Sequence, residues 1–501
     1  MGKQIKIGAI ISYLTLFINT LITLIYLPWM VSVVGKENYA LYTLATTLIS
    51  IFMVDFGLSS AVSRFIAKYN AEGKENKINE FIGTVESLYT IIGACIFAIL
   101  LVFYFFLDRV YTGLSTEEIR IFKSLYIIVA LYSIISFPCM PLSGILNAYE
   151  KFIQLKLCDL SQKILATLLT ICCLFIGGGV REVVLCNAIS GVIAIIARLI
   201  IIKINTPVKI HLGSFEQEML KSIFSFSIWI TVISLAQRCI YNIAPSILGI
   251  VSDSEAIAIF APGNTLESFF FMLASAVNGL FLPTISRYIA EGDNEKIYEL
   301  MVKVGRYQFI LLSLVFVGFF CVGKEFMFAW MGKDFVKSYP CVLLLFFPDI
   351  LLFTQQIANT TAIAKNIVKQ QALGYIGMAV ICVGTSFLLC GKLGALGSAI
   401  AISLSYLFLF AYLSMLYKKE LSINIIGFFK DCYFDLGIPI IIAAGISYVI
   451  CRFVSFNSLW ISIIIKAFIT IVVFLFCITF KLNTEEKSYI RRALIKLKII
   501  R

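Results

Sequence analysis

Long apolar segments alternate with short polar loops along the whole chain. A helix needs about 20 residues to cross the roughly 30 Å of bilayer hydrocarbon, and fourteen segments have about that length or more. They cover residues 8–33, 39–62, 81–107, 124–146, 157–176, 183–205, 222–248, 256–282, 304–322, 341–362, 371–389, 393–416, 432–453 and 459–480. The outer loops reach only about fifteen residues, and no loop is long enough to fold as a soluble domain. The pattern predicts an all-α polytopic membrane protein with about 14 transmembrane helices, whose working surface lies between the helices.

The composition excludes a soluble protein. Hydrophobic residues make up 60% of the chain and charged residues 14%, with a mean hydropathy of +0.96, whereas soluble domains have about 25% charged residues. Most of the 14 cysteines lie in apolar segments and lack the spacing of metal ligands. The sequence has no Gly-x-x-x-x-Gly-Lys-Ser/Thr loop for nucleotide phosphates. We therefore expect no metal, no cofactor and no ATP hydrolysis.

Basic residues are distributed unevenly between the two sides of the membrane. If the N-terminus is cytoplasmic, 29 of the 41 Lys and Arg residues lie on the cytoplasmic side and 10 on the outer side, while Arg238 and Lys466 lie within spans. Cytoplasmic loops are enriched in Lys and Arg, so both termini are expected in the cytoplasm. Membrane orientation and anionic lipids account for the net charge of +12, and we expect no nucleic-acid partner.

Two stretches of sequence recur in the two halves of the chain. Ser-Arg-Phe-Ile-Ala at 63–67 returns as Ser-Arg-Tyr-Ile-Ala at 286–290, and Glu-Gly-Lys-Glu-Asn-Lys-Ile at 72–78 returns as Glu-Gly-Asp-Asn-Glu-Lys-Ile at 291–297. The copies end the second and eighth segments, so the repeat unit has six helices. Because six is even, both halves enter the membrane in the same direction, and such halves enclose a cleft.

The repeat predicts four parts of the chain. They are a six-helix half at 1–212, a second six-helix half at 213–420, two additional helices at 421–480 and a basic cytoplasmic tail at 481–501. The tail mixes basic residues with Ile and Leu, which fits either an interfacial helix or a simple orientation signal.

The motif at the end of the second segment resembles that of a known superfamily. Gly35-Lys-Glu-Asn-Tyr39-Ala-Leu-Tyr, Val54-Asp-Phe-Gly-Leu58-Ser and Ser63-Arg64, with two six-helix halves and two extra helices, are similar to the multidrug/oligosaccharidyl-lipid/polysaccharide (MOP) exporter superfamily. Within it they resemble the polysaccharide-transport branch, the Wzx-type O-antigen flippases.

The resemblance implies a function and a location. It implies a flippase for an undecaprenyl-diphosphate-linked oligosaccharide, an O-antigen or capsule repeat unit, in the bacterial plasma (inner) membrane. The implied partners are this lipid-linked oligosaccharide and membrane lipids, with a polysaccharide assembly machinery as a further candidate.

Arg238 is the most deeply placed charge in the predicted spans, about sixteen residues into its segment. Gln237 precedes it, and Asn242 follows one turn later on the same face. A guanidinium binds phosphate in bidentate fashion, so these three residues are candidates for binding the substrate's diphosphate or an acidic sugar. The alternative is a structural ion pair of Arg238 with Glu267 or Asp349.

Four of the carboxylates inside predicted spans are candidates for coupling or gating, because a charge there is costly and is often functional. Glu267, near the middle of the eighth segment, is the first candidate for coupling transport to an H+ or Na+ gradient, and an ion pair is an equally good interpretation. Asp349 in the tenth segment is a second coupling or gating candidate. Asp55 and Glu86 lie in the cytoplasmic thirds of the second and third segments, where a gate, a cation site and a packing role each fit.

Polar residues in the tenth segment form a possible stripe. Gln356 and Asn359 share a helix face with Asp349, and Pro348 is expected to interrupt the helix. The stripe fits either a substrate cavity or a helix interface.

Other charged residues have simpler interpretations. Arg64 and Arg287 occupy equivalent places in the two repeats, at the cytoplasmic mouth of the cleft, where they fit either an entry site for a lipid diphosphate or the general basic bias of this side. Asp159 and Lys163 have i,i+4 spacing and are expected to form a structural pair. Lys466 is expected to extend to the membrane surface.

Three classes of function fit this topology. A flippase would move the charged sugar through a polar cleft by alternating access. A cation-coupled exporter of drugs or metabolites should have a mainly acidic cleft, whereas the deepest charge here is Arg238. A membrane enzyme such as a polymerase, ligase or acyltransferase would need a large outer loop or an intramembrane His, and the sequence has neither. We therefore favour the flippase and expect no enzymatic activity.

Overall fold

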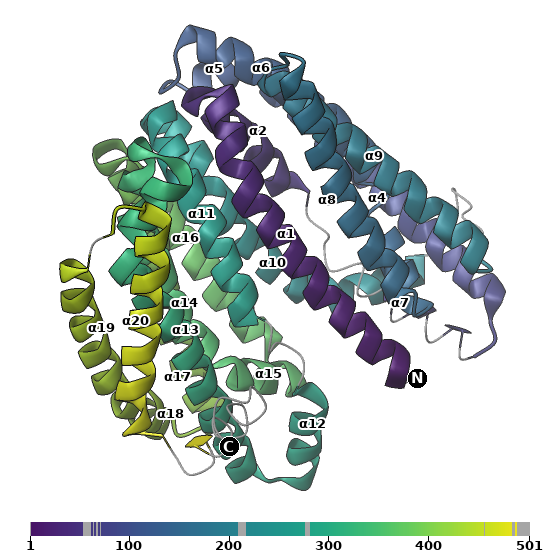
Figure 1. The fold of residues 1–501 in the computed structure, drawn as a ribbon. Helices are drawn as coiled ribbons and strands as arrows, with labels where there is room; N and C mark the ends of the chain where they lie inside the picture. The colour runs from purple at the N-terminus through teal and green to yellow at the C-terminus, as the bar shows by residue number, and fades with distance from the viewer. Residues whose placement is uncertain are drawn as a thin grey trace. The chain divides into compact units, whose positions relative to one another are not determined.

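The computed structural model of the chain is built of helices (Figure 1). It describes residues 2–53, 62–63, 65–66, 69–70, 72–208, 217–275, 281–454, 456–482 and 486–487; the side chains at 2–13, 16, 52, 217–227, 230, 239, 241 and 283 are not described. Every regular element within these ranges is helical. Twelve of these helices are long and apolar enough to cross a membrane. Two further helices occupy the second and seventh predicted segments, so the predicted all-α polytopic fold is confirmed.

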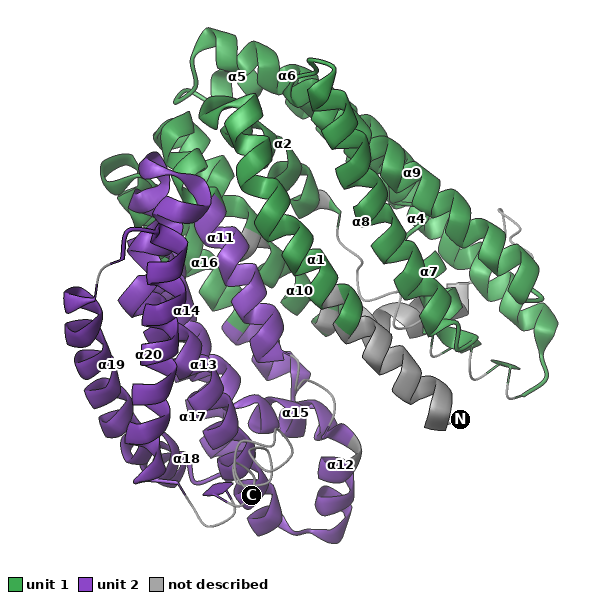
Figure 2. Cartoon of the chain, viewed as in Figure 1, with its two compact units in different colours: residues 1–261, 375–401 green, residues 262–374, 402–501 purple. Residues whose placement is uncertain are grey.

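The chain forms two compact units (Figure 2). Unit 1 comprises residues 1–261 and 375–401, and unit 2 comprises residues 262–374 and 402–501. Three helices, α11 (Ser254–Ser275), α16 (Val368–Leu393) and α17 (Ala395–Glu420), contribute to both units. The units are defined by packing and the predicted halves by sequence repetition, so the two divisions need not coincide, and the repeat boundaries stay a prediction.

Unit 1 contains the helices of the first predicted half and the first helix of the second. Its elements are α1 (Gly2–Val34), α2 (Lys36–Phe52), α4 (Glu75–Tyr104), α5 (Leu107–Val110), α6 (Thr116–Ser136), α7 (Leu142–Ala148), α8 (Phe152–Phe175), α9 (Val180–Asn205) and α10 (Gln217–Val251). Helix α2 packs on α6 and α10, and α8 packs on α9. Gly191 lets α9 approach α6, because a Cβ there would lie 2.3 Å from the Tyr132 hydroxyl.

Unit 2 is organised around one very long helix. Its remaining elements are α12 (Leu282–Glu291), α13 (Asn294–Met331), η1 (Lys333–Ser338), α14 (Tyr339–Thr354), α15 (Gln356–Ala364), α18 (Ile425–Phe428), η2 (Phe429–Phe434), α19 (Asp435–Phe453) and α20 (Leu459–Thr479). The 38-residue α13 packs on α14, α19 and α20. Large apolar side chains such as Ile441, Ile464 and Phe468 are exposed on α19 and α20, as expected of helices that face lipid.

The two copies of the repeated sequence have the same local structure where both are described. Gly73 and Gly292 adopt left-handed backbone conformations with φ of 69° and 72°, which glycine accepts without the strain of a side chain. A long helix begins soon after each of them, α4 at Glu75 and α13 at Asn294. The repeated Glu-Gly pair therefore serves as a helix-breaking turn in both places.

A buried carboxyl pair and a polar cavity as candidate functional sites

Glu267 on α11 and Asp349 on α14 form a buried carboxyl pair in unit 2. Their side chains are hydrogen-bonded to each other, and the residues are only 3% and 1% exposed. A hydrogen bond between two carboxyl groups requires a proton, because two carboxylates only repel each other. The Oε2 atom of Glu267 and the Oδ2 atom of Asp349 have no hydrogen-bond partner among the described residues. At least one of the two carboxyls is therefore protonated.

Aromatic packing fixes the separation of α11 and α14 next to the pair. Phe270 stacks on Phe346 with ring centroids 4.2 Å apart and an interplanar angle of 10°. Phe271 meets Phe353 edge to face at 5.0 Å. Such ring pairs hold two helices in a defined register. The sequence identified both carboxylates but gave no sign that they meet.

The predicted polar stripe of the tenth segment is not continuous. Pro348 was predicted to interrupt the helix, but it lies inside α14. The break comes instead at Gln355, between α14 and α15. The Gln355 amide exchanges hydrogen bonds with Ser414 of α17 at 2.9 and 3.3 Å, which stabilises the break. Asp349 therefore does not share one helix face with the two amides that follow.

Those two amides, Gln356 and Asn359, lie on α15. Asn359 Oδ1 accepts a hydrogen bond of 2.8 Å from Gln371 Nε2 of α16. Gln356 is buried. Of the two interpretations of this polar stripe, the contact of Asn359 favours a helix interface.

Arg238 lies on α10 in unit 1, half-buried. Its Nη1 donates a hydrogen bond of 3.1 Å to the Ser50 carbonyl of α2. The Asn242 amide donates to the Arg238 carbonyl at 3.1 Å, and the Gln237 side chain is hydrogen-bonded to Tyr375 of α16. Arg238 and Gln237 therefore link α10 to α2 and α16, whereas the Asn242 amide bonds within α10. Glu267, a predicted alternative partner of Arg238, is hydrogen-bonded to Asp349.

The other predicted gating residues differ in their surroundings. Glu86 on α4 is buried beside apolar side chains, and its Oε1 has no hydrogen-bond partner in the described part of the chain. Arg287 on α12 is exposed and lies 4.0 Å from Glu291. Asp55 and Arg64 lie outside the described residues, so the proposed symmetry of Arg64 and Arg287 stays a prediction.

Segments of the two predicted halves meet within unit 1, at their predicted outer ends. The Gly113 N–H donates to the Gly249 carbonyl at 3.3 Å, and a Cβ on Gly113 would lie 2.1 Å from the Ser252 carbonyl oxygen. Only glycine permits this backbone contact. An ion pair of 2.9 Å joins Lys36, at the start of α2, to Glu255, at the start of α11. These contacts close α2 and the α5–α6 loop against the junction of α10 and α11.

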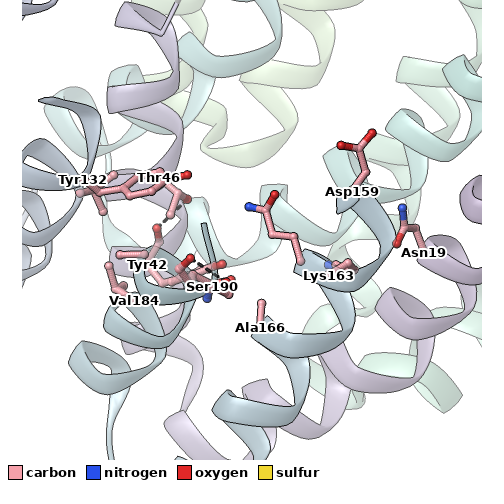
Figure 3. Close-up of a pocket in the computed structure, with 13 residues that line it drawn as sticks. Asn19, Tyr42, Thr46, Tyr132, Asp159, Lys163, Ala166, Val184 and Ser190 are labelled. Carbon is pink, nitrogen blue, oxygen red and sulfur yellow. Dashed lines mark hydrogen bonds between the residues drawn. The ribbon is translucent and has the colours of Figure 1, made fainter. Parts of the chain in front are cut away.

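A polar cavity of about 460 Å³ lies inside unit 1, between α1, α2, α6, α8 and α9 (Figure 3). Its lining includes polar side chains from all five helices: Asn19, Tyr42, Thr46, Tyr132, Asp159, Gln162, Lys163, Asn187 and Ser190. In Figure 3, Asp159, Lys163 and Ala166 follow one another along α8, and Tyr42, Tyr132 and Ser190 lie across the cavity from them.

The predicted structural pair of Asp159 and Lys163 does not form. Asp159 accepts instead from Arg198 of α9 at 2.8 Å and from Lys156 at 3.4 Å. An i,i+4 spacing permits a pair, but the guanidinium of a neighbouring helix competes for the same carboxylate. Lys163 is left facing the cavity, and no ion pair joins it to any residue that the structure describes.

The prediction for Lys466 was wrong, and the role of Arg306 was not predicted. Lys466 does not extend to the membrane surface; it is buried on α20 and forms an ion pair with Glu325 of α13. Arg306 on α13 is buried and binds Asp435 and Glu486. Its position at the start of a predicted span gave the only signal, because its partners lie far along the chain.

Comparison with known proteins places the chain in a family. The model of the family described as "Polysaccharide biosynthesis protein" matches residues 5–289, more than half of the chain. An uncharacterised membrane protein of Bacillus subtilis (strain 168), EpsK, is 22% identical over 450 residues, covering 86% of this chain and 85% of EpsK.

Two solved structures have a similar fold. The lipid II flippase MurJ in an inward closed conformation matches with a TM-score of 0.74 and 16% identity, covering 98% of this chain and 99% of MurJ. An inward-facing multidrug resistance MATE family transporter of the MOP superfamily matches with a TM-score of 0.69 and 17% identity, covering 83% of this chain and 98% of the transporter. The chain therefore belongs to the polysaccharide biosynthesis protein family, and its multi-pass membrane fold is similar to the folds of these two transporters.

Proposed function

We propose that the protein flips an undecaprenyl-diphosphate-linked oligosaccharide, an O-antigen or capsule repeat unit, across the bacterial plasma membrane, and that a proton gradient drives it. The observation that carries the proposal is the buried Glu267–Asp349 pair, a proton site inside a flippase fold. The family match supports a substrate from polysaccharide biosynthesis. The charge bias of the sequence supports cytoplasmic termini.

Alternating access gives the polar headgroup a route through the membrane. Moving a diphosphate through hydrocarbon without partners would cost tens of kcal/mol, so the headgroup must travel between helices while the polyprenyl tail stays in lipid. The contacts of Gly113 and Lys36 with the α10–α11 junction would close the outer side in one state and separate in the other. Loss or gain of the proton on the carboxyl pair would bias the two states.

A second candidate function is cation-coupled export of drugs or metabolites. The likeness to a multidrug transporter favours it, as does the presence of buried carboxyls. Deletion of the protein separates the two functions. The flippase predicts that lipid-linked oligosaccharide accumulates on the cytoplasmic leaflet and that surface polysaccharide disappears; normal surface polysaccharide with new sensitivity to cationic dyes would instead establish the exporter.

Arg238→Ala is expected to abolish export of surface polysaccharide while the protein still inserts into the membrane. A fixed guanidinium at mid-depth would bind the diphosphate in bidentate fashion, and loss of such a charge-assisted contact costs about 2–5 kcal/mol. Arg238→Lys should restore only part of the activity, because an ammonium cannot form the bidentate contact. Lys333→Ala, which removes an exposed charge from η1, is the control. Wild-type export by Arg238→Ala would contradict the role.

A further inference from the structure

The lining of the polar cavity in unit 1 includes neither Arg238 nor the two carboxyls of the Glu267–Asp349 pair. We propose that this cavity binds a sugar residue that carries a carboxylate, a hexuronate, with Lys163 as the partner of the carboxylate. This inference rests on the proposed function, because it names the chemical class of one sugar in the transported oligosaccharide.

The charges around the cavity favour an anion. Asp159 is the acidic residue of the lining, and its carboxylate is already bound by Arg198 and Lys156. The Arg198 guanidinium, at 2.8 Å, already balances that carboxylate, so Lys163 adds an uncompensated positive charge to the lining. Lys163 lies halfway along α8, where its side chain cannot reach either end of the helix. Lys163 is half-buried, and an ammonium with reduced access to water and no ion pair favours an anionic partner, so it would attract a carboxylate that enters the cavity.

The neutral side chains of the lining suit the hydroxyl groups of a sugar. Gln162, Asn187 and Thr46 present amides and a hydroxyl from three different helices. Asn19 also belongs to the lining, and its Oδ1 atom has no hydrogen-bond partner among the described residues. The Asn187 amide and the Thr46 hydroxyl donate to carbonyls of their own helices, each at 2.8 Å, so their oxygens remain as acceptors for sugar hydroxyls.

The rings and the size of the cavity point the same way. Tyr132 contributes an aromatic ring to the lining, and the apolar face of a sugar ring packs well on such a surface. The volume of about 460 Å³ falls within the range of about 300–1,000 Å³ typical of small-molecule sites. It therefore accommodates a single sugar residue rather than the whole lipid-linked substrate.

A carboxylate fits these groups better than a phosphate does. Phosphates are recognised best by guanidinium groups or by several donors that surround the charge. The guanidinium near this cavity, that of Arg198, is already bound to Asp159. Lys163 offers a single compact charge, which matches a monovalent carboxylate.

Binding of D-glucuronic acid, D-glucose and inorganic phosphate to the purified full-length protein tests the proposal. We expect the wild type to bind glucuronate at least about tenfold more tightly than glucose, the effect of roughly one favourable charge contact. Lys163→Met should remove this preference, and Lys163→Arg should retain part of it. Lys156→Met on the same helix is the matched control, since Lys156 pairs with Asp159 outside the cavity lining, and it should keep the preference.

Asn187→Leu keeps the proposal testable if Lys163→Met does not fold. It changes the lining on α9 without changing the charge, so we expect weaker binding of both sugars with the preference retained; unchanged binding of both sugars would show that the site is not in this cavity. Equal binding of glucuronate and glucose by the wild type would overturn the proposal. So would a preference that persists in Lys163→Met, or phosphate binding as tight as that of glucuronate.

The binding assay and the deletion experiment fail independently. Accumulation of lipid-linked oligosaccharide without any glucuronate preference would refute only the cavity assignment. Lys163-dependent binding of glucuronate in a protein whose deletion leaves surface polysaccharide normal would refute the flippase and leave the acidic-sugar site in place.

Discussion

Glu267→Gln is expected to leave the protein folded and to remove the dependence of flipping on the proton gradient. The Gln side chain has nearly the shape of a protonated Glu and can still donate a hydrogen bond to Asp349. It cannot release a proton, so the pair would stay locked in one protonation state. We expect gradient-driven flipping to fall at least about tenfold, since a ligand biases two states only by its differential affinity for them.

The measurement is flipping of lipid-linked oligosaccharide in vesicles with and without an imposed pH gradient. Asp349→Asn should behave in the same way, because either substitution leaves a pair that cannot titrate as a unit. Glu295→Gln, which changes an exposed carboxylate on α13, is the matched control and should respond to the gradient as the wild type does. An unchanged gradient response in both Glu267→Gln and Asp349→Asn would exclude the pair from coupling.

Glu86 is an alternative candidate for the residue that couples flipping to the proton gradient. It is also a buried carboxyl whose Oε1 has no hydrogen-bond partner among the described residues, but it lies on α4 in unit 1. If Glu86→Gln loses the gradient response and Glu267→Gln keeps it, the coupling site is in unit 1. The two variants therefore distinguish a shared proton from a single titrating carboxyl.

The sequence was sufficient to predict the helices because the bilayer imposes a length on them. An apolar segment shorter than about 17 residues cannot span the hydrocarbon, so each predicted segment contains helix, although the tenth is divided into α14 and α15. For the turn before α13, the signal in the sequence was the recurrence of the Glu-Gly pair, whose glycines are Gly73 and Gly292. Both glycines adopt a left-handed backbone conformation. The break between α14 and α15 was not visible, because it depends on Ser414 of another helix, and Pro348 was the more obvious local signal.

Pairing of charges was harder to predict than their presence. A charge inside a span is unusual in itself, so Glu267 and Asp349 could each be identified. Which partner a charge finds depends on helices that approach from far along the chain. Lys466 was therefore assigned to the surface although it pairs with Glu325, and Lys163 was assigned to Asp159 although Arg198 binds that carboxylate. A rule based on local spacing cannot take into account charged groups that approach from distant helices.

Arg306→Ala is expected to destabilise unit 2 more than any other single charge removal proposed here. The side chains of Arg306 and Glu486 are only 3% and 6% exposed. The guanidinium makes five hydrogen bonds, two to Glu486 at 2.7 and 3.1 Å, one to Asp435 at 2.8 Å, and one each to the carbonyls of Asp431 and Lys481 at 2.7 and 2.9 Å. Five bonds use every N–H that a guanidinium has.

The loss should come from the charges left behind. Removing one member of a buried ion pair costs about 3–5 kcal/mol because its partner stays buried and unpaired, and here Glu486 would be left in that state. The midpoint of thermal unfolding in detergent, at a fixed heating rate, and protease cleavage after the exposed Lys487 of the tail report the effect. Arg306→Ala should lower the midpoint and expose the tail, whereas Lys481→Ala, which removes an exposed partner of Asp435 at 3.2 Å, should change both little.

A double variant tests that explanation. Arg306→Met combined with Glu486→Leu removes both buried charges and keeps their apolar volume, so it should recover much of the stability lost in Arg306→Ala. Failure to recover would mean that the bonds to the Asp431 and Lys481 carbonyls matter more than the ion pair. In either case α13 holds the segment after α20 through Arg306, so the start of the basic tail is part of the packed structure of unit 2. The two interpretations of that tail then apply only to the residues beyond this attachment.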